Sequence, residues 1–198
     1  MSKRILGACV MLLFIFPFSA YGDSALNTVQ KRVTRVIEIL KDQSLKPESA
    51  KELKRAKIRA VTDEMFDFDE LSRRTLAKNW EKLNPAQQKE FIKLYREILE
   101  NAYMDKILSY SNQKILFLRE NAPEKGKAEV TTKIVTQTAE IPIDYQLIQR
   151  EGEWRVYDII IEGVSLVKNY RSQFREILAS KSPEEMLQIL RKKVGKPS

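Results

Sequence analysis

The spacing of apolar residues divides the chain into helical segments, then strands, then helices again. Before residue 111 apolar residues recur every three or four positions, which is typical of amphipathic helices. From there to residue 161 they alternate or run continuously over short segments, which indicates strands. The predicted helices are 24–40, 48–65, 67–80, 84–108, 165–179 and 183–194, and the predicted strands are 114–119, 129–135, 143–150 and 153–161. This order predicts an α+β domain, with helices packed on an antiparallel sheet of about four strands.

Residues with capping side chains mark where several of these helices begin. Ser24 precedes the first apolar stripe, and Asn84-Pro85 is an N-cap followed by proline at the first helical position, with Gln88 close behind. Ser182 stands in the same position before the last helix. The helix from Asn84 is apolar on more than one side, so we expect it to pack against the sheet on one face and against helices on another.

The predicted strand 153–161 is apolar on both faces. One face carries Trp154, Val156 and Ile160, and the other carries Tyr157, Ile159 and Ile161. After Glu162-Gly163 the apolar period becomes helical. A strand in an antiparallel sheet needs only one apolar face when the other meets water. This strand is therefore either a central strand enclosed in the core, or one of its sides lines a cavity filled by something apolar.

A cluster of five acidic residues raises the possibility of a calcium site. Its members are Asp63, Glu64, Asp67, Asp69 and Glu70. No glycine permits the sharp turn of a calcium loop, and Phe66 and Phe68 interrupt the series of oxygen ligands. We therefore expect Asp67 or Asp69 to cap the helix that continues through Trp80, and we expect no metal site.

The first 22 residues have the pattern of a secretory signal peptide. Lys3 and Arg4 precede an almost unbroken apolar run over residues 5–18, and small residues allow cleavage between Gly22 and Asp23. The run is short for a retained membrane anchor. Cys9 lies before most of the run, so we do not interpret it as a lipoprotein cysteine. The expected mature protein is one domain over residues 23–198, which we expect to be a periplasmic monomer.

Composition excludes several kinds of chemistry. The chain has no histidine, and Cys9, its single cysteine, leaves with the signal. We therefore expect no disulfide, no Cys or His metal site, no cofactor and no Ser-His or Cys-His nucleophile in the mature protein. Removal of Lys3 and Arg4 lowers the formal net charge from +8 to +6. Such a surface suits anionic lipid or an acidic protein, and export argues against nucleic acid.

The chain resembles the MlaC family of periplasmic phospholipid carriers, also called toluene-tolerance auxiliary proteins. The motifs that carry the resemblance are Trp154-Arg155-Val156-Tyr157-Asp158, Glu162-Gly163-Val164-Ser165-Leu166-Val167, Asn169-Tyr170-Arg171-Ser172-Gln173-Phe174, Phe66-Asp67-Phe68, Trp80, residues 85–91, Tyr103 and Ile141-Pro142-Ile143-Asp144-Tyr145. Together they span nearly all of residues 23–198. One departure is visible: many members have a Leu-Gly pair shortly before the tryptophan, where this chain has Leu76-Ala77.

The resemblance implies a strongly curved sheet of the nuclear-transport-factor kind that encloses an apolar pocket. It also implies no enzymatic activity and a carrier that shuttles phospholipid between the outer and inner membranes to maintain lipid asymmetry. The implied partners are an inner-membrane ABC transporter with a lipid-binding subunit and an outer-membrane lipoprotein complex. Some relatives are thought to carry hopanoids or other polycyclic lipids, and the same apolar wall would serve that cargo.

The predicted lipid-binding residues are those that give a helix or strand apolar surface on two sides. They are Tyr95, Ile98, Leu99, Tyr103, Ile107, Tyr145, Leu147, Val156, Val164, Val167 and Tyr170. We expect Arg171 to pair with a carboxylate rather than with a phosphate. Asp158 and Glu162 are expected to form hydrogen bonds locally or to pair with Arg155 or Arg171.

Two other classes of function stay open. An exported protein-interaction module would have a filled core, so Val164→Trp or Leu147→Trp would unfold it, whereas a carrier would accept the bulk and lose lipid. An exported enzyme would convert its lipid through Asp144, Asp158 or Glu162, but no nucleophile–base pair can be assembled from the residues present.

Overall fold

The domain consists of helices and one antiparallel sheet. The computed structural model describes residues 23–110 and 113–195. The α-helices are α1 (Ala25–Lys41), α2 (Lys51–Met65), α3 (Phe68–Leu76), α4 (Pro85–Leu108), α5 (Leu166–Ser180) and α6 (Pro183–Val194). Short 3-10 helices are η1 (Gln43–Leu45), η2 (Glu48–Ala50) and η3 (Ala77–Lys82). The strands are β1 (Lys114–Glu124), β2 (Lys127–Val135), β3 (Glu140–Arg150), β4 (Glu153–Ile161) and β5 (Val164–Ser165).

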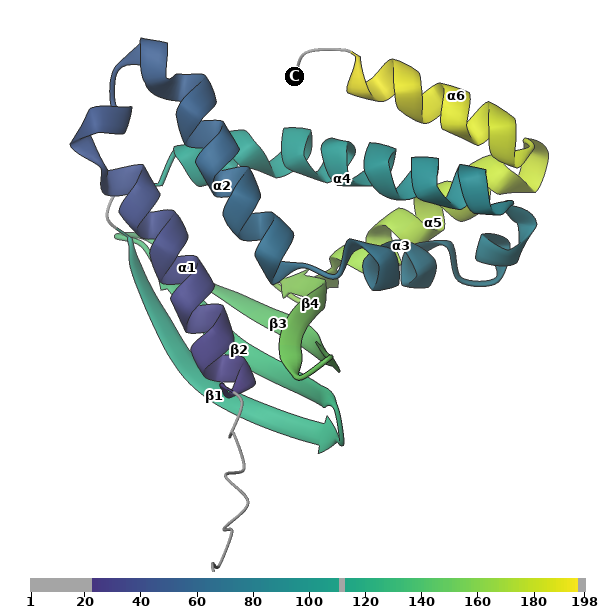
Figure 1. Ribbon diagram of the computed structural model, residues 1–198. Helices are drawn as coiled ribbons and strands as arrows, with labels where there is room; N and C mark the ends of the chain where they lie inside the picture. The colour runs from purple at the N-terminus through teal and green to yellow at the C-terminus, as the bar shows by residue number, and fades with distance from the viewer. Residues whose placement is uncertain (1–22, 111–112, 196–198) are drawn as a thin grey trace, which may run out of the picture.

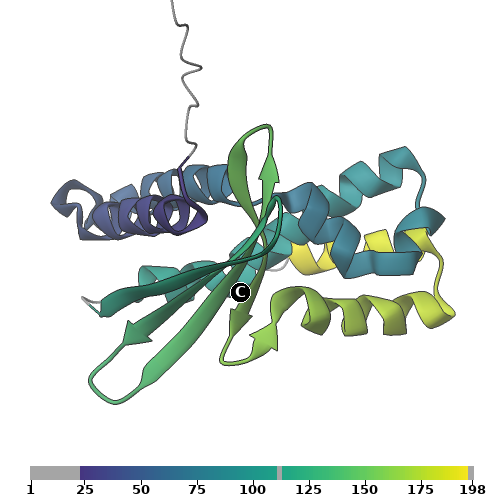
Figure 2. The same ribbon diagram turned by 90° about the horizontal axis from the view of Figure 1, so that it is seen from below.

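The sheet has the order β1-β2-β3-β4-β5, and every neighbouring pair is antiparallel. It is strongly curved, and α1 lies along one of its faces while α3, α5 and α6 gather at the other end of the molecule (Figure 1). The view from below shows the β3–β4 turn standing between the α1–α2 pair and α3 (Figure 2). The predicted α+β class with helices on a curved antiparallel sheet is confirmed, with the two-residue β5 as a fifth strand.

The first hairpin is longer than the sequence predicts. The predicted strands leave residues 120–128 as their connection, but β1 continues to Glu124 and the turn needs only Lys125 and Gly126. Pro123 is tolerated inside β1 because β1 is an edge strand and its register with β2 is interrupted between Asn121 and Glu124, where Pro123 has no partner in β2.

A β-bulge in β4 changes which side chains share a face. Leu147 lies opposite Val156, but the next residue of β3, Gln146, lies opposite Asp158, so Tyr157 is the extra residue. The expected alternation is therefore wrong beyond Val156. Ile159 lies on the face of Val156 and not on the opposite one, and Ile161 follows it there.

The predicted helix starts are confirmed, and one detail is corrected. Ser24 caps α1, Asn84 caps α4 and Ser182 caps α6. The partner that closes the capping box of α4 is Gln87, whose side chain accepts a hydrogen bond from the Asn84 N–H. Gln88 instead donates to the carbonyls of Trp80 and Leu83, and so ties α4 to the end of η3.

The predicted helix through Trp80 breaks at Ala77. Ala77 has φ 49° and ψ −123°, and α3 ends there while η3 begins. This backbone conformation favours glycine, because a Cβ is crowded by the neighbouring carbonyl. Ala77 occupies the place where the Leu-Gly pair of the resembled family has its glycine, so the departure noted in the sequence falls on a strained turn.

We predict that Ala77→Gly stabilises the protein by about 1 kcal/mol. Relief of the positive φ is worth about 1–3 kcal/mol, and the added freedom of the unfolded chain costs about 0.5–1 kcal/mol. Thermal unfolding should show a rise in Tm of about 2–4 °C. Ala56→Gly is the matched control because Ala56 is exposed within α2, and it should lower Tm. A lower Tm for Ala77→Gly would contradict the interpretation.

Candidate functional site

The buried apolar residues form three separate clusters. The helical cluster joins α3, α4, α5 and α6, and its centre contains Phe91, Tyr95, Tyr170 and Phe174 with neighbouring ring centroids 5.1–6.0 Å apart. The sheet cluster joins α1 to strands β2, β3 and β4. The third cluster lies between α1, α2 and the last turns of α4. None of the three joins α4 to a strand among the described residues, so the expected packing of α4 on the sheet is not part of the core.

The eleven predicted lipid-binding residues are divided among these clusters. Tyr95, Ile98, Leu99, Val167 and Tyr170 belong to the helical cluster, with Tyr103 at its edge; Tyr145, Leu147 and Val156 belong to the sheet cluster; Ile107 borders the third. Val164 lies outside all three and is 61% exposed. The structure therefore does not bring the eleven residues together as one wall, and their contact with lipid stays a prediction.

Register identifies a set of apolar residues that are not among the eleven predicted lipid-binding residues. Ile134 lies opposite Ile141, Ile143 opposite Ile161, and Tyr145 opposite Ile159, all on the face that carries Val130 and Leu147. We call the five half-buried members of this face the isoleucine strip: Ile134, Ile141, Ile143, Ile159 and Ile161. Ile143 and Ile159 pack against the sheet cluster, so the strip extends its apolar surface toward solvent. The bulge at Tyr157 is what places Ile159 and Ile161 on this face, and periodicity alone could not find it.

Chain connectivity places the last turns of α4 at the end of the sheet that carries the isoleucine strip. Residues 109–113 alone separate α4 from β1, and Lys114 lies opposite Val135, the neighbour of Ile134. The end of α4 is therefore at the same end of the sheet as Ile134 and Ile141. Here α4 carries Tyr103, Ile107 and Leu108, which are also half-buried. The end of α4 and this end of the sheet therefore both carry apolar side chains that are only half-buried.

Each part of this apolar surface contains a tyrosine, Tyr145 on β3 and Tyr103 on α4. Burial raises the pKa of Tyr145 to about 12 and also raises the pKa of Tyr103, so both stay neutral at physiological pH. The ammonium group of Lys106 lies 5.6 Å from the ring centroid of Tyr103. The end of α4 therefore combines an apolar surface with a phenol and a cation, a combination suited to an amphiphile with an anionic head.

Two surface cavities have a different character from this region. One, of about 750 Å³, lies between α1, α2 and the β3–β4 turn and has Lys31, Arg32, Arg35 and Lys57 on its walls. The other, of about 510 Å³, lies where α2, α3 and α4 meet. None of the eleven predicted lipid-binding residues lines either cavity.

Carboxylates of the acidic cluster cap a helix or pair with arginines. Asp67 caps α3 by accepting a hydrogen bond from the Glu70 N–H at 2.8 Å, as one of the two expected alternatives. Asp63 pairs with Arg96 and Glu64 with Arg32. In residues 23–110 and 113–195 no group of three or more acidic, histidine or cysteine side chains is arranged to hold a metal ion. In the same residues no helix is both long and apolar enough to cross a bilayer.

Other charged residues singled out in the sequence have structural partners. Arg171 donates two hydrogen bonds to the carbonyl of Arg74, at 3.1 and 2.7 Å, so it closes the end of α3 and the expected pairing with a carboxylate is wrong. Asp158 is buried and bonds locally, as expected. Glu162 is exposed at φ 50° in the β4–β5 turn, and Arg155 and Arg171 have other partners, so the expected pairing of Glu162 with either arginine is wrong.

Glu70 is the centre of a network that fastens the β3–β4 turn to α3. Its carboxylate is buried and accepts hydrogen bonds from Arg73 and Arg74 on its own helix and from Arg150 on β3. The Arg74 guanidinium also lies 4.0 Å from the ring centroid of Tyr157, the bulged residue. Burial by itself raises the pKa of Glu70, but the hydrogen bonds from Arg73 and Arg74 outweigh it, and the pKa of this carboxyl lies below its ordinary value.

We predict that this network makes stability fall in acid. The pKa of Glu70 is lower in the folded protein than in the unfolded chain, so the unfolded state takes up the proton first as pH falls. The stabilisation by Glu70 is therefore complete above about pH 5 and is lost progressively at lower pH. Glu70→Gln should lower Tm at pH 7 and flatten the dependence of Tm on pH between about 5 and 3. Glu176→Gln, at an exposed position of α5, is the control and should follow the wild type. Equal acid slopes in the Glu70→Gln variant and the wild type would contradict the assignment.

Comparisons with known proteins identify a family and relatives of this chain. The family model described as "MlaC protein" matches residues 30–192. The toluene tolerance protein ttg2D of Pseudomonas putida is 24% identical over 172 residues, which cover 85% of this chain and 80% of that protein. The intermembrane phospholipid transport system binding protein MlaC of Haemophilus influenzae is 24% identical over 131 residues, 63% of this chain and 60% of that protein.

A solved structure shares the fold. The phospholipid-binding protein from Ralstonia solanacearum in complex with a phospholipid superposes with a TM-score of 0.76 at 21% identity, covering 88% of this chain and 100% of that one. At this identity the likeness establishes the architecture. It also means that a relative with the same curved sheet and helices holds a phospholipid.

Proposed function

Since the chain belongs to the MlaC family, we propose that it is a non-enzymatic phospholipid carrier whose acyl-chain site lies between the isoleucine strip and the last turns of α4. The observation that carries this proposal is the half-buried apolar surface that the isoleucine strip and the end of α4 present at the edges of the three buried clusters. The phospholipid held by the structural relative supports the cargo class. In this proposal the fully buried predicted residues, such as Tyr95 and Leu147, support the site as core, while Tyr103 and Ile107 touch lipid.

The energetic task of such a carrier is to replace the bilayer interior. A diacyl phospholipid has about 30 methylenes, each worth about 0.8 kcal/mol when buried, so exposure of the whole lipid to water costs on the order of 25 kcal/mol. A soluble protein lowers this cost only if it offers apolar surface that is open before the lipid enters. Ile143, Ile159 and Ile161 have that property because they are apolar and yet only half-buried.

The proposed place of action is the periplasm after removal of residues 1–22. The predicted signal falls outside the described residues, and its apolar run is the sequence feature that supports export. The proposed partners are an inner-membrane ABC transporter with its lipid-binding subunit and an outer-membrane lipoprotein complex. Movement of phospholipid between these two would maintain the asymmetry of the outer membrane.

Lipid transfer between vesicles tests the carrier function. Residues 23–198 would be incubated with donor vesicles of labelled phosphatidylglycerol and phosphatidylethanolamine and with unlabelled acceptor vesicles. The proposal predicts that label moves to the acceptors in proportion to protein concentration, without any change in the mass of the lipid. Conversion of the lipid would favour an enzyme, and the absence of both transfer and uptake would favour a protein-interaction module. Preferential transfer of a hopanoid added to the donors would keep the carrier and change its cargo.

A further inference from the structure

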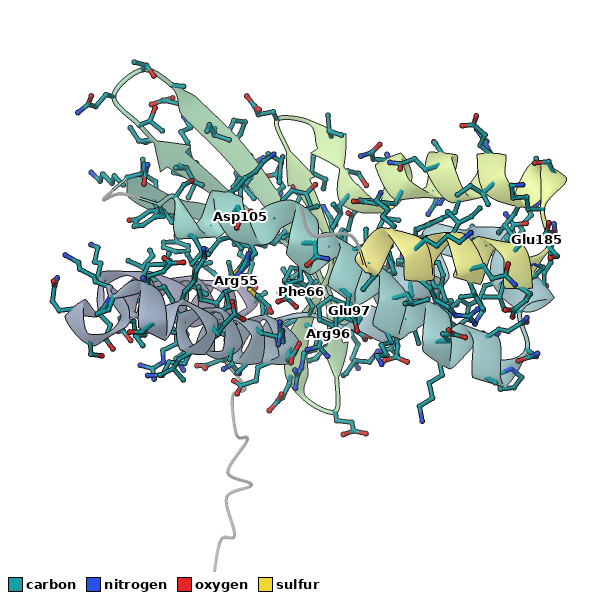
Figure 3. The ribbon with its side chains drawn as sticks, turned by 90° about the horizontal axis from the view of Figure 1, so that it is seen from above. Arg55, Phe66, Arg96, Glu97, Asp105 and Glu185 are labelled. Atoms are coloured by element: carbon teal, nitrogen blue, oxygen red, sulfur yellow. The ribbon has the colours of Figure 1, made fainter. Side chains whose placement is uncertain are left out.

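The cavity of about 510 Å³ where α2, α3 and α4 meet has an aromatic floor. Phe66 and Phe68 stack on each other with ring centroids 5.4 Å apart, and Ile92 of α4 adds apolar surface beside them. The backbone holds this floor in place, because the Asp67 N–H donates to the carbonyl of Val156 at 2.9 Å and Phe66 forms a parallel bridge with the same strand residue. Figure 3 shows Phe66 and Arg96 close together where α2 ends beside α4.

Five cations surround this floor, and the three arginines among them are already bound. Arg96 pairs with Asp63 at 2.5 Å, and its guanidinium lies 5.5 Å from the ring centroid of Phe68. Arg150 pairs with Asp67 and Glu70, both at 3.1 Å. Arg155 pairs with Glu153 and donates to the carbonyl of Glu64 at 2.6 Å. The guanidinium groups therefore shape the cavity and have their charge largely compensated.

The remaining two cations, Lys89 and Lys93, are free. Both are exposed, and because they are four residues apart on α4 they lie on the same face of the helix. Neither forms an ion pair within the part of the chain that the structure describes. Glu90, the acidic residue between them, is bound by Arg191 at 2.6 and 2.9 Å. Asp69 is the one carboxylate among the lining residues that forms none of these ion pairs, and it is exposed.

This composition fits a protein partner better than a phosphate. Aromatic residues and arginine are enriched at the centres of protein interfaces, and their rims are polar. A phosphate group is bound best by several free donors, especially forked guanidinium groups, but those are occupied here. The cavity volume suits one or a few inserted side chains. An apolar side chain would pack on Phe66 and Phe68 while neighbouring carboxylates approach Lys89 and Lys93.

We propose that this cavity docks an acidic segment of the lipid-binding subunit of the inner-membrane transporter, and that Lys89 and Lys93 recognise its carboxylates. The inference rests on the proposed carrier function, since it assigns a docking surface for the exchange of cargo. The docking surface is separate from the isoleucine strip, so binding of the partner and binding of lipid can be measured independently.

Charge reversal tests the proposal with a defined probe. The probe is the purified periplasmic domain of the lipid-binding subunit of the inner-membrane transporter from the same organism, measured by biolayer interferometry at 50 and 300 mM NaCl. Lys89→Glu with Lys93→Glu should weaken binding about tenfold at the lower salt and reduce its salt dependence. Phe68→Ala should weaken binding at both salt concentrations. Lys89→Arg with Lys93→Arg should bind as the wild type does.

The control variant carries the same change of charge elsewhere. Lys78 and Lys82 are exposed, also four residues apart, and lie on η3 outside the cavity lining. Lys78→Glu with Lys82→Glu should leave binding unchanged. An equal loss for both double variants, or wild-type binding by the Lys89/Lys93 variant, would overturn the proposal, as would the absence of binding by the wild type.

Two further readouts separate this proposal from its premise. Lipid content, measured by native mass spectrometry, should be the same in the Lys89/Lys93 variant and the wild type; absence of lipid from both would refute the carrier function itself. Flotation with vesicles of phosphatidylethanolamine and phosphatidylglycerol tests a membrane surface as the occupant. Loss of vesicle binding in the variant without loss of partner binding would contradict the protein-docking assignment.

Discussion

Ile143→Trp is expected to leave the protein folded and to lower its affinity for phospholipid about 50-fold. Ile143 is half-buried in the middle of the isoleucine strip, opposite Ile161. An indole at this position would displace about three methylenes of an acyl chain, each worth about 0.8 kcal/mol, and every 1.4 kcal/mol is a factor of ten in affinity. The protein itself should lose about 1 kcal/mol of stability, because the position is incompletely packed. Circular dichroism would verify the fold, and a vesicle partition assay would measure the affinity.

The matched control is Ile148→Trp on the same strand. Ile148 is also half-buried, but it follows the inward-facing Leu147 and so points to the opposite face of the sheet. It should retain lipid as the wild type does. The two tryptophan substitutions suggested by the sequence separate a carrier from an interaction module less well. Leu147 is fully buried, so its replacement by tryptophan would unfold a carrier too. Val164 is 61% exposed, so a tryptophan there would block no lipid. Equal lipid affinity in the Ile143 and Ile148 variants would rule out the isoleucine strip as the lipid site.

Asp158→Ala is expected to destabilise the protein by about 3 kcal/mol. The buried carboxylate of Asp158 accepts a hydrogen bond from the Ser165 hydroxyl at 2.5 Å and another from the Val167 N–H at 3.0 Å. Ser165 in turn caps α5 by accepting from the Lys168 N–H. Hydrogen bonds to charged groups contribute about 1.5–3 kcal/mol each, and the groups left behind are buried donors without partners. Thermal unfolding should show a decrease in Tm of about 6–12 °C.

Asp144→Ala provides the comparison for this change. Asp144 is a half-buried aspartate of the neighbouring strand and lies opposite Ile160. No hydrogen bond or ion pair of its side chain is present in the described part of the chain, so its removal should change Tm by less than about 2 °C. A similarly small shift for Asp158→Ala would mean that the junction between β4 and α5 does not depend on this carboxylate.

Local chemistry explains why most of the architecture could be predicted from the sequence. Ser24, Asn84 and Ser182 cap helices at the expected residues because their side chains accept backbone N–H bonds, a property independent of the rest of the fold. The change from helical to alternating spacing correctly separated the helical part from the sheet. Asp67, one of the two expected caps, begins α3 for the same local reason.

The candidate site could be predicted only in part because it depends on register and on uneven burial. Tyr157 is an extra residue in β4, and this single bulge moves Ile159 and Ile161 to the inner face. Periodicity identified Tyr95 and Leu147 as apolar, but nothing in the sequence distinguishes a side chain enclosed in core from Ile143, which remains half-buried. Arg73 and Arg74 lie within one helical turn of Glu70, but Arg150 lies on β3 and becomes a neighbour of Glu70 only in the folded chain.

In the proposed function, residues 23–198 hold a phospholipid against the isoleucine strip. Native mass spectrometry of this protein, purified from the periplasm without detergent, tests the claim most directly when lipids are extracted from the same sample. The wild type should show one stoichiometric adduct with the mass of a phospholipid, which should be lost in Ile143→Trp but not in Ile148→Trp. A protein that carries no adduct, and that takes up none from vesicles, would contradict the account.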